Sequence, residues 1–188
     1  MTVRLASLFH DIGKTAVRAP GKDREWTFYG HEEASARMVD RIFRRLKTSN
    51  EERECVMHLV KNHMFSYTPD WTGSAVRRFI KRIGIENIDP LFELRIADMN
   101  ATLGHAPDIT NLYAFADRIN EELDMESALS IKDLKIDGRR LIELGIKPGP
   151  DMGKILSELL EEVIEDPSLN TPEYLEKRAV SLFQSRAQ

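Results

Sequence analysis

Apolar side chains recur at the three- and four-residue spacing of an α-helix along almost the whole chain, and strand-like alternation is nearly absent. In residues 31–47 this spacing places Met38, Val39, Ile42, Phe43 and Leu46 on one side of a helix. The same pattern predicts further helices over 2–12, 49–64, 72–83, 89–103, 111–126, 137–144, 151–165 and from about 171 onward. The sequence therefore predicts an all-α fold.

Capping residues indicate where several of these helices begin. Ser49 and Glu52 have the spacing of a capping box. Asp89 is a good N-cap followed by Pro90, and Asp137 is a good N-cap for the helix over 137–144. Residues 14–29 are rich in turn formers and predict a loop. Glycines and prolines cluster after residue 127, which predicts a domain over 1–126 and a small helical tail over 127–188.

Composition excludes several classes of protein. The 188 residues are 41% hydrophobic and 31% charged, which is typical of a globular protein. No apolar run approaches the roughly 20 residues of a membrane span, and the N-terminal segment does not resemble a signal peptide. The single cysteine cannot form an internal disulfide, so we expect a cytoplasmic protein with no membrane partner. A net charge of −4 argues against a generally cationic nucleic-acid binder, although the first 104 residues carry a slight basic excess.

Ligand-type side chains occupy apolar positions on several predicted helices. His10 and Asp11 end the first helix, and Asp98 falls where the stripe through Leu91 and Leu94 calls for an apolar residue. His31 and His63 likewise continue the apolar stripes of their own helices. Imidazole and carboxylate groups together suit a divalent metal, and a buried carboxylate costs several kcal/mol unless it is paired or metal-bound. The alternative is a capping aspartate with hydrogen-bonded core histidines.

Two further histidines and one basic helix have other interpretations. His58 falls between the apolar positions of its helix and is predicted to face solvent, and His105 is at best a reserve ligand. The basic residues of the helix over 72–83 would form a phosphate-backbone surface or merely solvated charges. These residues are Arg77, Arg78, Lys81 and Arg82.

Long blocks of the sequence resemble a known family. The segments LASLFHDIGK and FYGHEEASARMVDRIFRRLKTSNEERECVMHLVKNHM resemble the HD superfamily of metal-dependent phosphohydrolases. The segments SAVRRFIKRIG, LFELRIADMNA and LKIDGRRLIELGIKPGPDMGKILSELLEEVIEDPSLNTPEYL resemble the C-terminal region of bacterial CCA-adding tRNA nucleotidyltransferases and poly(A) polymerases. The resemblance implies an HD-type helical bundle followed by a helical tail.

The resemblance also implies roles for individual residues. His10 and Asp11 match the HD doublet, and Asp98 matches the closing aspartate of the motif, which makes these three the expected metal ligands. His31 and His63 match histidines that serve the metal site or the substrate phosphate in several HD groups. The pattern usually has one more histidine upstream of the doublet, and MTVRLASLF contains none, so the HD domain is expected to be N-terminally incomplete.

These residues predict a metal-dependent phosphohydrolase acting on phosphoesters of nucleotides or RNA ends. In this hypothesis Asp11, His31, His63 and Lys14 carry the catalytic roles, and Lys14 neutralises phosphate charge. The metal would be Mg, Mn, Ni, Co, Fe or Zn. One alternative is a non-catalytic tRNA- or RNA-binding body and tail with a vestigial metal site, and another is a protein-binding scaffold built on 127–188. The chain has no Asp-x-Asp pair, so as it stands it is not expected to add nucleotides.

Overall fold

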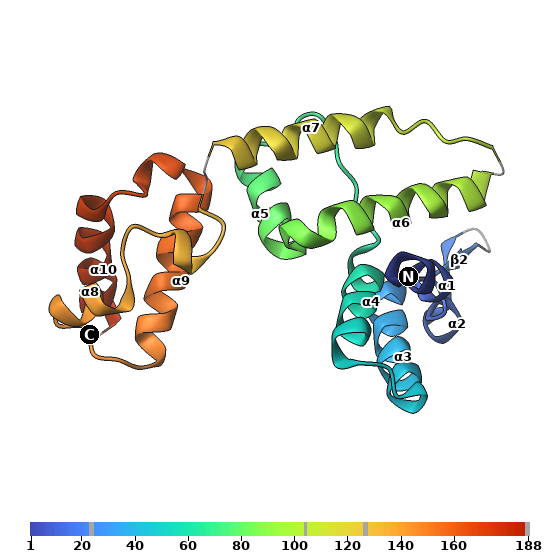
Figure 1. Ribbon diagram of the computed structural model, residues 1–188, viewed down its shortest axis with the longest axis horizontal. Helices are drawn as coiled ribbons and strands as arrows, with labels where there is room; N and C mark the ends of the chain where they lie inside the picture. The colour runs from blue at the N-terminus through green and yellow to red at the C-terminus, as the bar shows by residue number, and fades with distance from the viewer. Residues whose placement is uncertain (23–24, 104, 126–127, 187–188) are drawn as a thin grey trace. The chain divides into compact units, whose positions relative to one another are not determined.

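The computed structural model describes residues 1–22, 25–103, 105–125 and 128–186. It confirms the predicted all-α class, since within these residues the only sheet is one antiparallel pair of two-residue strands, β1 (Ala19–Pro20) and β2 (Trp26–Thr27) (Figure 1). The helices described are α1 (Thr2–Phe9), α2 (Lys14–Val17), α3 (His31–Leu46), α4 (Asn50–Asn62), α5 (Gly73–Ile83), α6 (Ile85–Leu103), α7 (Thr110–Asp124), α8 (Gly138–Glu143), α9 (Pro150–Glu165) and α10 (Pro172–Arg186), with short 3₁₀ turns η2 (Ile131–Asp133) and η3 (Pro167–Leu169). None of these described helices combines the length and the apolar character that crossing a membrane requires.

The predicted helix starts agree with the structure at two caps and differ at α6. The side chain of Ser49 accepts a hydrogen bond from the Glu52 amide, and Asp137 accepts one from the amide of Arg140. Helix α6 begins at Ile85, before the predicted cap, because Gly84 with φ +80° already turns the chain after α5. Pro90 is therefore inside α6, where it removes one backbone hydrogen bond in the second turn.

The N-terminal third also departs from the predicted element bounds. The helix predicted over 2–12 ends at Phe9, and residues 10–13 form a turn. The predicted loop over 14–29 contains the four-residue helix α2 and the two strands. Elements this short carry too few residues for a hydrophobic period to be recognised.

The chain forms two compact units, each contributed by two segments. The first unit comprises 1–68 and 83–113, and the second comprises 69–82 and 114–188. The boundary after residue 126 stays a prediction about domains, because compact packing units and domains need not coincide.

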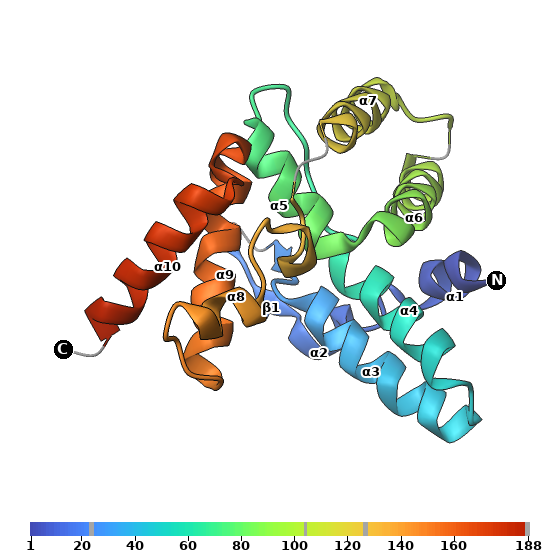
Figure 2. The same ribbon diagram turned by 60° about the vertical axis from the view of Figure 1, so that its left-hand side comes forward.

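The first unit is built around the antiparallel pair of helices α3 and α4. Helix α1 lies against α4 and α6, as Figures 1 and 2 show from two directions. The rings of Phe9 and Phe43 meet edge to face, with centroids 5.6 Å apart. Their neighbours in the core include Ala6, Val39, Val56, Leu59, Val60, Leu91 and Leu94.

Gly13 fixes the turn after α1 against the start of α3. Its amide donates a buried 2.9 Å hydrogen bond to the hydroxyl of Ser35. A Cβ atom at this position would lie 2.4 Å from the Ser35 amide nitrogen and 2.6 Å from the carbonyl oxygen of His31. Only glycine permits this approach, so Gly13 determines how close residues 10–12 come to α3.

The second unit holds a buried ion pair between α5 and α7. Arg77 and Glu122 are 6% and 2% exposed, and the Arg77 guanidinium donates to the Glu122 carboxylate. The same guanidinium donates a 2.8 Å hydrogen bond from Nε to the carbonyl oxygen of Ile164 at the end of α9. Arg77 therefore joins three helices of this unit.

A separate hydrophobic cluster stabilises the tail helices of the second unit. Helices α9 and α10 pack side by side, and the turn and helix that precede them cover the same core. Its fully buried side chains include Leu141, Ile146, Ile155, Leu159, Val163, Ile164, Leu175 and Ala179.

We expect Arg77→Met to lower the free energy of unfolding by about 3–5 kcal/mol, because it leaves the Glu122 carboxylate buried without its main partner. Urea denaturation followed by circular dichroism measures the change. The double variant Arg77→Met/Glu122→Leu should recover much of the loss, since no buried charge remains. Full stability in the single variant would contradict the ion pair.

We expect Gly13→Ala to lower the free energy of unfolding by roughly 1–3 kcal/mol, because the new methyl group collides with backbone atoms of α3. The matched control is Gly153→Ala in α9, where nothing lies within 4 Å of the added Cβ. That change should be neutral or slightly stabilising, since alanine favours the helix. Equal effects of the two substitutions in thermal melts would refute the close approach.

Candidate metal centre

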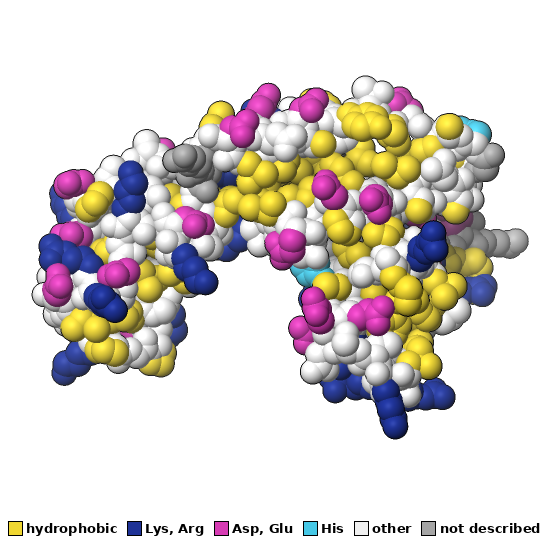
Figure 3. All heavy atoms as spheres, in the orientation of Figure 1, with side chains coloured by type: hydrophobic (Ala, Val, Ile, Leu, Met, Phe, Trp, Pro, Cys, Tyr) yellow, Lys and Arg dark blue, Asp and Glu magenta, His cyan; other side chains and the backbone are white. Residues whose placement is uncertain are grey.

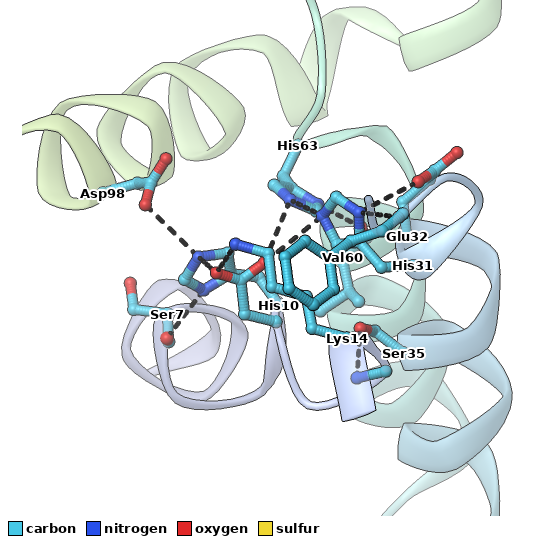
Figure 4. A network of polar contacts seen from close by, with 12 residues as sticks. Ser7, His10, Lys14, His31, Glu32, Ser35, Val60, His63 and Asp98 are labelled. Carbon is cyan, nitrogen blue, oxygen red and sulfur yellow. Dashed lines mark hydrogen bonds and ion pairs between the residues drawn. The ribbon is translucent and has the colours of Figure 1, made fainter. Parts of the chain in front are cut away.

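Five ligand-type side chains of the first unit converge from four segments (Figure 4). His10 is the C-cap residue of α1, and Asp11 follows it in the turn. His31 is the first residue of α3, and His63 is the C-cap residue of α4. Asp98 comes from α6. Helix ends rather than helix faces thus supply all three imidazoles.

Each histidine is oriented by a hydrogen bond to its own segment. The Nδ1 atoms of His10, His31 and His63 lie 2.7–2.9 Å from the carbonyl oxygens three residues earlier. A carbonyl oxygen can only accept, so each Nδ1 carries a proton. In the neutral ring Nε2 then presents a lone pair, which is the tautomer that a metal-binding imidazole requires.

The Nε2 atoms and the carboxylate oxygens lie at the separations of ligands around one ion. His10 Nε2 is 3.3 Å from Asp11 Oδ2 and 3.3 Å from Asp98 Oδ1. His31 Nε2 is 3.2 Å from Asp11 Oδ1 and 3.2 Å from His63 Nε2. Ligands about 2.1 Å from a shared ion are separated by roughly 3.0–3.4 Å. Among the described residues, the group whose ligand atoms all lie within 4.8 Å of one another is His10, Asp11 and His63. Asp98 and His31 border this group through their contacts with His10 and Asp11.

Two atoms of this cluster are buried without a hydrogen-bond partner among the described residues. They are Nε2 of His10 and Oδ1 of Asp11. The Nε2 lone pair of His31 faces that Asp11 oxygen, and the Nε2 atoms of His31 and His63 face each other. Lone pairs at these distances repel unless a proton or a cation lies between them. The donor set therefore fits a divalent cation bound by nitrogen and oxygen ligands.

The electrostatics favour the protonation states that metal binding needs. Burial raises the pKa of Asp11, but the hydrogen bond from Lys14 and the nearby histidines outweigh it, so the net pKa lies below the ordinary value. Lys14 Nζ is 2.6 Å from Asp11 Oδ2. Burial lowers the pKa of His63, and the neighbouring imidazoles lower it further. Asp11 is therefore ionised and His63 neutral near pH 7.

Asp98 uses its two oxygens differently. Oδ1 faces His10, while Oδ2 is 3.5 Å from the guanidinium of Arg95 one turn earlier in α6. The Asp98 side chain is 25% exposed. Although it lies on the apolar stripe of α6, its carboxylate is therefore at the solvent-facing edge of the site.

The remaining histidines lie outside the cluster. His58 was predicted to face solvent, but it is half-buried, and its Nε2 lies 2.8 Å from the carbonyl oxygen of Ile83. His105 is exposed, and its Nδ1 lies 3.0 Å from the carbonyl oxygen of Ala106. Each ring therefore has a backbone carbonyl as its partner, 25 residues away for His58 and one residue away for His105.

The cations of the basic helix α5 have partners within the protein, and a phosphate-backbone surface on this helix stays a prediction. Arg77 is buried with Glu122, so it is unsuited to reach a phosphate. Arg78 and Lys81 are ion-paired at 2.6 Å with Glu165 and Glu161 of α9. The guanidinium of Arg82 lies 5.5 Å from the centre of the Phe79 ring. Acidic partners 45 to 87 residues away pair with three of the four cations, which the pattern of one helix cannot reveal.

A more concentrated basic surface occurs at the end of α3. Figure 3 shows dark-blue side chains gathered where the α3–α4 pair ends. The sequence signal is RIFRRLK over 41–47, in which the exposed cations are Arg41, Arg44, Arg45 and Lys47. Arg44 pairs with Asp40 within the helix. Each segment has four cations, in 41–47 and in 77–82, so charge density in the sequence does not distinguish them; the difference lies in their partners.

Comparison with known proteins identifies the family. The family model for tRNA nucleotidyltransferase domain 2 matches residues 23–179. An A-adding tRNA nucleotidyltransferase of Deinococcus radiodurans is 30% identical over 165 residues, covering 86% of this chain and 37% of the relative. A CC-adding tRNA nucleotidyltransferase of Thermus thermophilus is 29% identical over 168 residues, covering 88% of this chain and 36% of the relative.

A third relative matches a shorter stretch. The multifunctional CCA protein of Cupriavidus necator is 31% identical over 83 residues, covering 44% of this chain and 20% of the relative. No solved structure gives a significant match. The chain spans little more than a third of the length of the first two relatives. Since the family model covers most of the chain, the protein belongs to the tRNA nucleotidyltransferase domain 2 family.

Proposed function

We propose that this chain is a metal-dependent phosphohydrolase of the HD type, acting on phosphoesters of nucleotides or RNA ends. The observation that carries the proposal is the convergence of three Nε2 lone pairs on two carboxylates, with two buried atoms left without hydrogen-bond partners. Holding these polar groups together without a counter-charge costs folding free energy. A purely structural role does not explain that cost, because apolar side chains in the same place would make the fold more stable.

The residues divide naturally into ligands and substrate groups. His10, Asp11 and Asp98 are the proposed metal ligands, and His63 is near enough to Asp11 to complete the set. A divalent ion bound there would supply an activated water and Lewis acidity toward a phosphoryl oxygen. Asp11 is ionised to receive such an ion, and its hydrogen bond to Lys14 holds the carboxylate in one orientation.

We assign Lys14 and His31 to contacts with the substrate phosphate. The Lys14 side chain is 41% exposed, so its ammonium group borders both Asp11 and solvent. His31 is buried, and it lies between Asp11 and His63. In the proposed reaction Lys14 offsets phosphate charge, while His31 or His63 contacts the phosphate or donates a proton to the leaving oxygen.

A second candidate function is a non-catalytic tRNA-binding body. The family match and the basic end of α3 favour this alternative. Contact between Arg41, Arg45 or Lys47 and a phosphate backbone would be electrostatic and would weaken with salt. The two functions are compatible, and separate measurements distinguish them.

We expect the purified chain to bind about one divalent ion. Asp11→Asn combined with Asp98→Asn should weaken binding at least tenfold, because two charged ligands become neutral amides. Titration with Mn²⁺, Co²⁺, Ni²⁺ and Zn²⁺ and elemental analysis measure this. The control is Asp40→Asn, which removes a carboxylate that pairs with Arg44 on α3 away from the site. Unchanged affinity in the double variant would contradict the ligand assignment.

We expect weak hydrolysis of a 2′,3′-cyclic nucleotide and of an aryl phosphate that requires metal and stops on chelation. Asp11→Asn should abolish the activity, and Lys14→Gln should lower kcat/KM roughly tenfold to hundredfold, because one positive group facing the phosphate is lost. Lys61→Gln is the matched control, since Lys61 pairs with Glu33 on the surface.

The contrary outcome is a purified chain that hydrolyses neither substrate with Mg²⁺, Mn²⁺, Ni²⁺, Co²⁺, Fe²⁺ or Zn²⁺. If the chain also retains tRNA in filter-binding assays, and Arg41→Ala with Arg45→Ala removes that retention, the binding-body function is the correct one.

A further inference from the structure

An aromatic hollow opens beside the metal centre in the first unit. It has a volume of about 490 Å³, within the range of small-molecule sites. Two of its lining residues, Lys14 and His31, belong to the proposed site. The rest of the lining is largely apolar and comprises Trp26, Thr27, Phe28, Tyr29, Gly30, Glu32 and Met64.

The side chains of this hollow are unusually exposed for their type. Trp26 is 52% exposed, Tyr29 87% and Met64 58%. Scattered exposed apolar residues are ordinary, but a contiguous group at the rim of a polar site indicates a binding surface. These side chains do not pack into the core of the first unit, so core packing does not account for apolar residues at these positions.

The indole of Trp26 is held in place rather than loosely attached. The guanidinium of Arg18 lies 3.5 Å from the centre of the Trp26 ring, which covers one face of the indole. Trp26 also pairs with Pro20 in the register of β1 and β2. A planar partner stacking on the opposite face would therefore meet a ring that is already ordered, which lowers the entropic cost of binding.

The polar side of the hollow offers one cation to an anion joined to that planar group. Lys14 is the cation, and its ammonium group also lies 5.9 Å from the centre of the Phe28 ring. Glu32 also lines the hollow, and its carboxylate lies 3.6 Å from Nδ1 of His31. Aromatic side chains beside a cation are the combination with which proteins bind single nucleotides and single-stranded ends. An alkyl phosphate would use only Lys14 and leave the aromatic surface uncovered.

We propose that this hollow is a nucleobase subsite, so that the substrate is a nucleotide, either free or at the end of an RNA strand. The base stacks on Trp26 and Tyr29 while the phosphate lies at Lys14 and the metal ligands. The inference rests on the proposed phosphohydrolase function for its catalytic meaning, but base binding is measurable without turnover.

The experiment uses the intrinsic fluorescence of the full chain. The sequence has two tryptophans, Trp26 and Trp71, so Trp71→Phe leaves Trp26 as the single reporter. AMP and a short RNA ending in a 3′-phosphate should both quench this signal and compete with each other. Ribose 5-phosphate, which has the phosphate and sugar but no base, should not. Quenching by AMP but not by RNA assigns the subsite to free nucleotides, and the reverse assigns it to strand ends.

Variants separate stacking from a loss of folding. Tyr29→Ala, at an exposed position, should weaken AMP binding roughly tenfold and leave the binding of inorganic phosphate unchanged. Trp26→Phe should keep most of the AMP affinity in equilibrium dialysis, whereas Trp26→Leu should lose it. AMP and ribose 5-phosphate binding equally well, or no response to either, would overturn the subsite.

Hydrolysis distinguishes the two proposals. Base-dependent binding without turnover by any metal would leave the subsite standing and remove the phosphohydrolase function. Turnover of a cyclic nucleotide with unchanged KM in Tyr29→Ala and Trp26→Leu would support the phosphohydrolase function and remove the nucleobase subsite.

Discussion

The candidate centre depends on three hydrogen bonds that are local in sequence. Each imidazole donates its Nδ1 proton to a carbonyl three residues earlier, so each ring is oriented by its own turn of backbone. Tertiary packing then has only to bring the helix ends together. The apolar contacts of α1, α3, α4 and α6 do this, and Gly13 sets the final approach. The site is thus built by combining local orientation with ordinary core packing.

This arrangement carries an energetic cost that the surrounding structure must offset. The Nε2 atoms of His31 and His63 face each other at 3.2 Å, and His10 Nε2 is buried beside two carboxylates. Lys14 compensates part of the Asp11 charge from the solvent side. Clusters of strained, incompletely paired groups occur at functional sites, where a ligand supplies what the protein lacks.

Helical periodicity allowed the fold class to be predicted, and it pointed inward for three of the five ligand-type residues; His10 and Asp11 were recognised as an adjacent pair at a helix end. His31, His63 and Asp98 interrupt apolar stripes, and such positions face a core. The side-chain pairing of α5 could not be predicted, because Glu122, Glu161 and Glu165 lie 45 to 87 residues from their partners. The small strands β1 and β2 were missed since two residues show no period, although Trp26 and Tyr29 lie in and beside them.

The division of charges between the two units explains why their roles can differ. All proposed ligands and Lys14 belong to the first unit, where the basic end of α3 is also found. In the second unit three of the four cations of α5 are matched by glutamates of α7 and α9, so they hold helices together. A polyanion attracted to uncompensated cations would therefore meet the first unit. The basic end of α3 and the proposed chemistry therefore belong to the same compact unit, while the buried Arg77–Glu122 pair and the apolar tail cluster stabilise the second unit.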